Sequence, residues 1–461
     1  MKALSKPHWK PFSVLAACVF ASCTVLVTGE TGKGLGEPCE KDDECHGDGI
    51  CGDGICTLTC DSDAVCPDTT SCFGNTCQLP LKVGFIYVGV PEDFGWTLTH
   101  EEGRTYVENA LPYVETSYVT NVFTVETTLA AIDDFVAQGV DVIVANSFSI
   151  REPTLDAAAD NPDTLFLVCS GNETTPNLGT YFARSHQAWY VAGAAAAAKS
   201  STGRLGFIGS FVTPEVVRHI NAFTLGARSV DSSVVVEVRW EGFWFDLDDP
   251  VNGKTRDVVL TEELIGTDCD VIAHNMDTPF VVERVEEAHD AGMDVFSIGN
   301  DNLNACDFGK SSCIGVPYWN WGPLYARIFD DIHKKRFDPS VQINDNIRVN
   351  PEESISYFGT NEDVVEPTLN IQLAELTGSL AADKDLAFRG PYDTTGQRES
   401  VKSGEELDDD ELLTMCWFVE GVVEKADPED PMSADLPAQV PTGDVEIPLG
   451  SGITPDCRVN Q

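Results

Sequence analysis

Aromatic side chains recur near the ends of expected strands, and polar side chains lie close to each of them in the sequence. Such a set can hold a flat heteroaromatic ligand, because rings stack on its two faces while amide and carboxylate groups bond to its edges. We expect a binding site formed by Trp96, Asn146, Phe148, Tyr181, Trp244, Asp277, Asp301 and Trp319. Any one of these rings alone is as well explained by packing in a core, so the expectation depends on the whole set.

The common signatures of enzymes are missing from the chain. It has no G-x-S-x-G elbow, no H-E-x-x-H motif and no G-x-G-x-x-G after a strand. Its eight histidines are scattered without the spacing of metal ligands. We therefore expect a protein without catalytic activity, cofactor or metal.

The elements that must position the aromatic set alternate between apolar strands and helices. LKVGFIYVGV, VDVIVAN, TLFLVC, GRLGFIGS and CDVIAHN are continuous apolar runs of the kind found in buried parallel strands. Helices are expected at 99–110, 127–138, 154–159, 215–228 and 280–291. This alternation predicts an α/β fold with parallel sheets, and the length favours two sheets of about five or six strands each. A hinged pair of such lobes places a cleft at the carboxyl ends of both sheets.

Eight cysteines before the main domain repeat with a period of 21 residues. They are Cys39, Cys45, Cys51 and Cys56, followed by Cys60, Cys66, Cys72 and Cys77. A duplicated pattern rich in Gly and Asp predicts two small modules, each held by two disulfides, and therefore an oxidising compartment. We also expect Cys306 to pair with Cys313 and Cys416 with Cys457, whereas Cys169 fits a free thiol in a buried strand. Cys269 is left open.

The first 29 residues have the features of a signal peptide. Lysines precede an apolar stretch that is too short to span a bilayer. LAAC, ending at Cys18, is the better lipobox sequence, whereas FASC, ending at Cys23, leaves a more usual apolar length, so we favour lipidation of Cys23. The alternative is ordinary cleavage near Gly29. The expected location is the periplasm or the cell surface, with a lipid anchor.

The chain is strongly acidic, with 75 acidic against 29 basic residues and a formal net charge of −46. This charge argues against nucleic acid as a partner and against an anionic membrane surface. A membrane contact is expected only through the lipid anchor. The acidity itself is explained most simply by a solvated surface.

Long strings spread over the main domain carry a family resemblance: GWTLTHEEGR, VIVANSF, NLGTYFARSHQAWYVAG, EVVRHINAFTLGAR, FWFD, YWNWGP and LLTMCWFVEG. From about Lys82 to Val422 the chain resembles the basic membrane protein family of ABC-transporter substrate-binding proteins, the purine-nucleoside-receptor-like group. The resemblance implies a periplasmic-binding-protein type I fold of two Rossmann-like lobes with a hinge. It also implies a purine base or nucleoside as ligand and an ABC permease in the inner membrane as partner. The expected domains are 1–29, the cysteine-rich residues 30–80, and the two-lobed residues 81–461.

The family's site residues can be carried onto this sequence. Two aromatic residues, one from each lobe, sandwich the base in that family, and their positions match Trp96 and Trp244. The Asn-Ser-Phe turn matches Asn146 and Phe148.

The sequence also departs from the family pattern. The family's acidic residue after the strand MDVFSIGN matches Asp301, with Asn300 as the alternative, and its Gly-rich turn falls at Asn275–Asp277, which lacks the glycine. Nucleoside-binding members carry a lysine where this chain has Trp319. Because that lysine would serve the sugar, its absence favours a free base over a nucleoside.

Two other functions are weighed beside the receptor. In the first, the cysteine-rich modules bind a partner at the cell surface and the two-lobed part is a scaffold. In the second, the protein is an enzyme acting on a nucleoside, for which the sequence supplies no nucleophile or acid–base pair.

Overall fold

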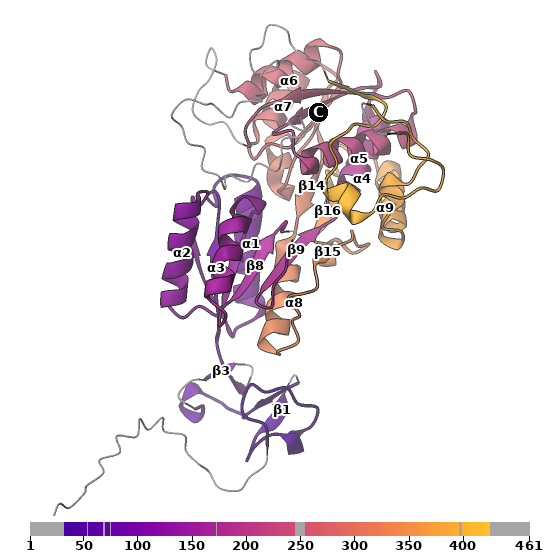
Figure 1. The fold of residues 1–461 in the computed structure, drawn as a ribbon. Coiled ribbons are helices and arrows are strands. Elements are labelled where there is room, and N and C mark those ends of the chain that lie inside the picture. Colours follow the sequence, from indigo (N-terminus) through magenta and orange to yellow (C-terminus); the bar gives the residue numbers. More distant parts are fainter. Residues whose placement is uncertain are drawn as a thin grey trace, which may run out of the picture.

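The computed structural model describes residues 32–424, apart from Asp53, Asp68, Thr69, Gly74, Asn172, 245–253 and 396–398. The expected signal peptide, both lipobox cysteines and Cys457 lie outside the described residues. In the described part, no helix combines the length and the apolar character that crossing a membrane requires. Figure 1 shows a small cysteine-rich body below two larger lobes, with the first lobe next to it.

The cysteine-rich body consists of two copies of one disulfide-linked unit. The first contains η1 (Asp42–Glu44), β1 (Ile50–Gly52) and β2 (Ile55–Thr57), and the second contains η2 (Asp63–Val65), β3 (Ser71–Phe73) and β4 (Thr76–Gln78). Disulfides join Cys39 to Cys51, Cys45 to Cys56, Cys60 to Cys72 and Cys66 to Cys77. The expected pair of disulfides in each module is confirmed, and the order of pairing, first to third and second to fourth, is the same in both.

The second module contacts the first lobe at the end where its strands begin. Phe73 packs against the lobe's apolar core. The imidazole Nε2 of His333 lies 3.0 Å from the carbonyl oxygen of Leu79 in the connecting segment, and the His333 ring stacks on Tyr113 with 4.1 Å between centroids. Because the carboxyl ends of the strands are at the other edge of the sheet, the modules lie away from the expected cleft.

The first lobe is a six-stranded parallel sheet in the order β15-β9-β8-β7-β5-β6. Its elements are β5 (Leu81–Ile86), α1 (Trp96–Ala110), β6 (Val114–Val119), α2 (Val125–Ala137), β7 (Val142–Ala145), η3 (Phe148–Ile150), α3 (Arg151–Asp160), β8 (Leu165–Cys169), β9 (Leu178–Ala183), α8 (Trp321–His333) and β15 (Ile343–Asp345). Helices α1 and α8 share one apolar core with the sheet, and α2 and α3 pack on its other face.

The second lobe has a seven-stranded sheet in the order β16-β14-β13-β12-β10-β11-β17, parallel except for β16 against β14. Its strands are β10 (Arg204–Gly209), β11 (Val235–Trp240), β12 (Val271–His274), β13 (Phe296–Ile298), β14 (Cys313–Trp319), β16 (Ser356–Thr360) and β17 (Val422–Glu424). Its helices are α4 (His186–Lys199), α5 (Pro214–Val230), α6 (Arg256–Gly266), α7 (Phe280–Asp290), η4 (Leu303–Phe308), η5 (Pro351–Glu353), α9 (Pro367–Ala382), η6 (Leu386–Phe388) and α10 (Asp409–Leu413). Helices α4 and α5 cover one face, and α6 and α7 the other.

The chain crosses between the lobes three times. It passes from β9 to α4, from β14 to α8, and from β15 to β16. Trp319 ends β14 and Trp321 begins α8, so both lie at the second crossing. Short connections of this kind can act as a hinge about which two lobes rotate.

Helices α4 and α5 approach closely because a glycine of each faces the backbone of the other. A Cβ atom built on Gly193 would lie 1.9 Å from the carbonyl oxygen of Phe223, and one on Gly226 would lie 1.9 Å from that of Tyr190. Only glycine fits at these two positions. The pair thereby fixes the packing of the second lobe's main helical layer.

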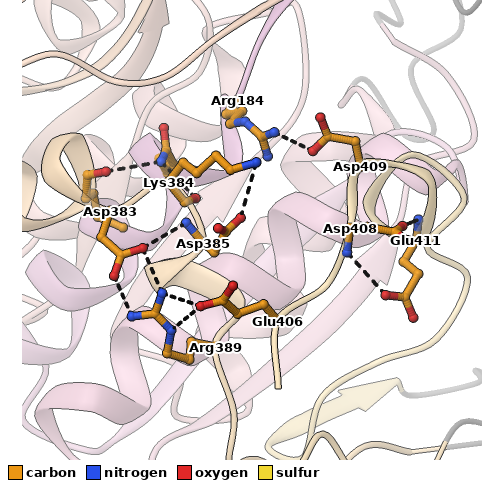
Figure 2. A network of polar contacts seen from close by, with 11 residues as sticks. Arg184, Asp383, Lys384, Asp385, Arg389, Glu406, Asp408, Asp409 and Glu411 are labelled. Atoms are coloured by element: carbon orange, nitrogen blue, oxygen red, sulfur yellow. Dashed lines mark hydrogen bonds and ion pairs between the residues drawn. The ribbon is translucent and has the colours of Figure 1, made fainter. Parts of the chain in front are cut away.

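The tail returns across the second lobe and is held by ion pairs, which Figure 2 shows. Arg389 pairs with Asp383 and, at 2.5 Å, with Glu406. The buried Arg184, just after β9, pairs with Asp409 of α10. Part of the acidic run at 405–411 therefore serves to attach the tail to the first crossing. Cys416 is disulfide-bonded, but its expected partner is outside the described residues.

The sequence-based expectations need three corrections here. The sheets have six and seven strands, so the second exceeds the expected size. Residues 178–183 form strand β9, which the expectation did not include. The tail after Pro351, expected to be irregular, contains β16 and the long helix α9.

Candidate functional site

Polar side chains at the carboxyl ends of several strands form the candidate site. Asn146 directly follows β7 in the first lobe, Asn275–Asp277 follows β12 in the second, and Asn300 and Asp301 follow β13. Asn146 is fully buried, and its Oδ1 accepts the backbone N–H of Val88 at 3.0 Å. Its Nδ2 has no partner among the described residues, so it can donate a hydrogen bond to a ligand.

Trp96 stands at the first turn of α1, where the two lobes touch. Its indole Nε1 donates to the carbonyl oxygen of Asn146 at 2.9 Å. The preceding residue is Gly95, and a Cβ there would lie 2.6 Å from Oδ1 of Asp277 and 2.9 Å from its Cα. The glycine thus lets the second lobe reach the start of this helix.

Asp277 and Asp301 form a carboxyl pair within this contact. The two side chains are hydrogen-bonded to each other, and the backbone of Trp96 lies close to Asp277. Burial raises the pKa of Asp277 well above its usual range, and the charges of Asp93 and Asp301 raise it further. Burial likewise raises the pKa of Asp301 to about 7. Two carboxyl groups in hydrogen-bond contact share one proton, so the pair is one donor and several acceptors.

The hinge contributes a stack of rings beside the carboxyl pair. Trp319 lies parallel to Trp321, with centroids 4.7 Å apart, and Trp321 in turn stacks on His100 at 4.6 Å. Trp96 meets Trp319 edge to face at 5.6 Å. Because Trp319 Nε1 donates to Asp301 Oδ1 at 2.9 Å, the hinge, the acid and the first-lobe tryptophan are in direct contact.

Trp244 approaches the same place from the second lobe. Its carbonyl oxygen accepts the backbone N–H of Asp277 at 2.8 Å, and its side chain is 40% exposed. Asp277 therefore connects Trp244 on one side to Trp96 on the other. The Trp244 ring packs against Phe211 with centroids 5.7 Å apart and keeps the rest of its surface exposed.

Two of the expected site aromatics have partners within the first lobe. The guanidinium of Arg151 lies over the Phe148 ring at 3.6 Å. Tyr181 is fully buried in the core, and its hydroxyl is 2.8 Å from that of Tyr325. Tyr181 comes after β8 as expected, but it lies inside the next strand, β9, and belongs to the core of the lobe. We therefore remove Tyr181 from the candidate site, while its neighbour Phe182 packs on Trp319 at 5.2 Å.

Comparisons with known proteins show the family of the chain. Residues 81–350 match the family described as ABC transporter substrate-binding protein PnrA-like, named Bmp. The chain is 34% identical over 354 residues to a purine-binding protein of Brucella abortus, covering 75% of this chain and 93% of the relative. The chain belongs to the Bmp family. It is therefore a substrate-binding protein of the ABC transporter type, and the resemblance found in the sequence is confirmed.

Two further comparisons place this Bmp chain more widely. A putative glucose-binding protein of an ABC transporter from Haloferax volcanii is 32% identical over 254 residues, covering 55% of this chain and 61% of the relative. A solute-binding protein structure from Aeropyrum pernix superposes with a TM-score of 0.56 at 16% identity, covering 72% of this chain and 95% of that one. The expected periplasmic-binding-protein type I fold is confirmed.

Sequence reasoning missed the contacts at the rim of this Bmp cleft. Phe94 of the first lobe meets Phe308 of the second edge to face at 5.7 Å. Asn302 Nδ2 donates to Glu102 Oε2 at 3.1 Å, also between lobes. The disulfide between Cys306 and Cys313, expected from the sequence, holds the segment that carries Phe308. The positive φ of 63° at Phe94 is unusual for a bulky residue, and no sequence pattern signals it.

Proposed function

We propose that this protein is the extracytoplasmic binding component of an ABC importer and that it binds a free purine base between its lobes, without catalysis. The observation that carries the proposal is the convergence of Trp96 and Trp244 on Asp277, from opposite lobes. Two indole rings supply stacking surfaces, and the carboxyl pair supplies both a donor and acceptors. A purine base presents the same two features, a flat ring and an edge with donors and acceptors.

Trp319 supports a free base over a nucleoside. The ring is 6% exposed and its Nε1 is bonded to Asp301, so the place of the family's sugar-binding lysine is occupied by an aromatic side chain. A bulky ring leaves less room for a ribose and offers its hydroxyl groups no cation. The name of the Brucella relative, a purine-binding protein, agrees with this ligand class.

The proposed location rests on the disulfides. Five pairs are present in the described part of the chain, and such bonds persist in oxidising compartments. We propose attachment to the membrane through a lipid on Cys23 or Cys18, with the cysteine-rich modules as a spacer. Because those modules contact the first lobe away from the cleft, an anchor there would leave the cleft accessible to an ABC permease.

Calorimetric titration of the full-length protein with adenine, adenosine and glucose tests the ligand. We expect adenine to bind more tightly than adenosine, and glucose not to bind. Glucose is included because the Haloferax relative is named for it and because indole rings also stack on sugars. Binding of glucose alone would contradict the proposed ligand, and tighter binding of adenosine would contradict the role given to Trp319.

A further inference from the structure

A buried chain of hydrogen bonds runs from the first crossing to the cleft. Ser185, which follows β9, has its Oγ 2.7 Å from Nε2 of His219 on α5. The other ring nitrogen of His219, Nδ1, is 3.4 Å from Nδ2 of Asn275. Asn275 Nδ2 also lies 3.5 Å from Oδ1 of Asn300, whose own Nδ2 is 3.3 Å from the carbonyl oxygen of Met276. The four side chains that form the chain are at most 6% exposed.

The carbonyl oxygen of Met276 fixes which atom donates at each step. It can only accept, so Asn300 must direct its Nδ2 toward it and its Oδ1 toward Asn275. Asn275 must then present Nδ2 to that oxygen, and the same amide group faces His219. Nδ1 of His219 is therefore the acceptor, and the ring proton is on Nε2, where it is donated to Ser185.

The ring of His219 is suited to this neutral form. It stacks on Trp189 with 5.6 Å between centroids. Burial, with a smaller contribution from the charge of Arg218, holds the pKa of His219 well below its usual range. A neutral ring with Nε2–H keeps Nδ1 as an acceptor and so holds the amide of Asn275 in one orientation.

The consequence is an acceptor without a protein partner. With Nδ2 of Asn275 engaged twice, its Oδ1 is left buried, and it has no hydrogen-bond partner among the described residues. Leaving a buried acceptor unpaired costs about 1–3 kcal/mol. The residue directly follows β12, two positions before Asp277, at the edge of the sheet that faces the other lobe.

We infer that Asn275 determines ligand specificity by accepting a hydrogen bond from a ligand N–H through Oδ1, with His219 and Ser185 as positioning residues that fix the amide. The inference rests on the proposed function, since it names the hydrogen bond by which the second lobe recognises the edge of a purine. A base with an N–H group at this point satisfies the acceptor, whereas an analogue that carries C–H there leaves it unpaired. Such a mismatch is penalised more strongly than a missing apolar contact.

The binding of three bases shows which N–H group of the ligand bonds to Oδ1 of Asn275. Adenine has both the exocyclic amino group and a ring N–H, purine lacks the amino group, and 9-methyladenine lacks the N–H at position 9. Calorimetry with the full-length protein should show Asn275→Ala binding adenine about tenfold more weakly. The loss should disappear for the analogue that lacks the group read by Oδ1. Asn109→Ala, at an exposed position on α1, is the matched control and should bind all three as the parent does.

An equal loss for all three bases, or unchanged adenine binding in Asn275→Ala, would overturn the inference. His219→Phe keeps the stack on Trp189 but loses the acceptor that orients Asn275. We expect this variant to show smaller differences in affinity among the three bases. Its melting temperature should stay close to that of the parent. A parent protein that binds none of the three contradicts the proposed function instead. Nitrogen-15 NMR of the histidine side chains then still decides: a proton on Nε2 of His219 supports the inference, and one on Nδ1 overturns it.

Discussion

Asp277 in the second lobe lies against Gly95 in the first lobe, so closely that a Cβ atom on Gly95 would be 2.6 Å from its Oδ1. Gly95 directly precedes helix α1, whose first turn is capped by Asp93 of the same lobe: its carboxylate accepts the backbone N–H groups of Thr97 and Leu98. The side chain of Asp277 therefore meets the capped start of a helix of the other lobe, and the two lobes touch at the point where we propose that the ligand is held.

Replacing Asp277 should weaken this link between the lobes. Asp277→Ala removes the side chain that lies against Gly95 and bonds to Asp301 but leaves the Asp93 cap in place, and we expect a cost of about 1 kcal/mol of interlobe stability. Small-angle X-ray scattering of the ligand-free protein should show a larger radius of gyration, and base affinity should fall. Asp133→Ala, at an exposed site on α2, is the control. A radius of gyration equal to that of the parent would refute the role of Asp277 in holding the lobes together.

The carboxyl pair makes stability depend on pH in a defined direction. The pKa of Asp301 is raised from 3.8 to about 7, chiefly by burial, so folding favours its neutral form. The resulting stabilisation is complete below the unfolded pKa and is lost as pH rises through about 7. Asp301→Asn keeps an acceptor for Trp319, supplies a permanent donor to Asp277 and tolerates the positive φ of 59° at this position.

We expect the Asp301→Asn variant and the parent to have similar melting temperatures at pH 5. At pH 8 the variant should be more stable, by about 1 kcal/mol, because the buried Asp301 of the parent is then ionised, whereas the amide of the variant stays neutral. Thermal melts of both proteins without ligand, with Asp133→Asn as control, measure this. A stability difference that does not change between pH 5 and pH 8 would contradict the raised pKa of Asp301.

Trp244 offers a test of stacking without a large cost to folding. Its side chain is 40% exposed, so Trp244→Ala should melt close to the parent while binding the base more weakly by roughly 1–3 kcal/mol. The matched control is Ile371→Ala, which removes an apolar side chain that is 60% exposed on α9. Equal affinity of Trp244→Ala and the parent would exclude this ring from the site.

Replacing glycine by alanine should change the free energy of unfolding in opposite directions at two positions. Gly193→Ala would place a methyl group 1.9 Å from the carbonyl oxygen of Phe223, so α4 and α5 must separate at a cost of about 3 kcal/mol. Gly378→Ala on α9 meets nothing within 4 Å and should stabilise the protein by about 0.5–1 kcal/mol. Chemical unfolding of the two variants should give changes of opposite sign, and a neutral Gly193→Ala would contradict the close helix packing.

The local patterns of the sequence predicted the repeated α/β units well. Helix α5, expected at 215–228, spans Pro214–Val230, because Thr213 and Pro214 start it in the ordinary way and one face is apolar. Helix α4 escaped prediction because its sequence, HQAWYVAGAAAAAK, is apolar and small nearly throughout, so it lacks the periodic contrast between apolar and polar residues on which such predictions depend. Strand β17 was missed because it has three residues and pairs with β11 far away in the chain.

The site could be predicted only in part, because local sequence patterns do not show which distant segments meet. Strand ends pointed to Asn146 and Asp301, since their positions follow from local pattern and from the rule that parallel strands present their carboxyl ends together. The same reasoning misplaced Tyr181, because a strand of small and aromatic residues resembles a loop after a strand. The contact between Asp277 and Trp96 depends on how two lobes meet, and no local pattern encodes that relation.

Native mass spectrometry of the freshly purified full-length protein tests the central claim most directly, because it weighs whatever small molecule remains between the lobes. We predict a bound species with the mass of a purine base, absent from Trp244→Ala prepared in the same way. A bound hexose in its place, or a base retained equally by both proteins, would contradict the account.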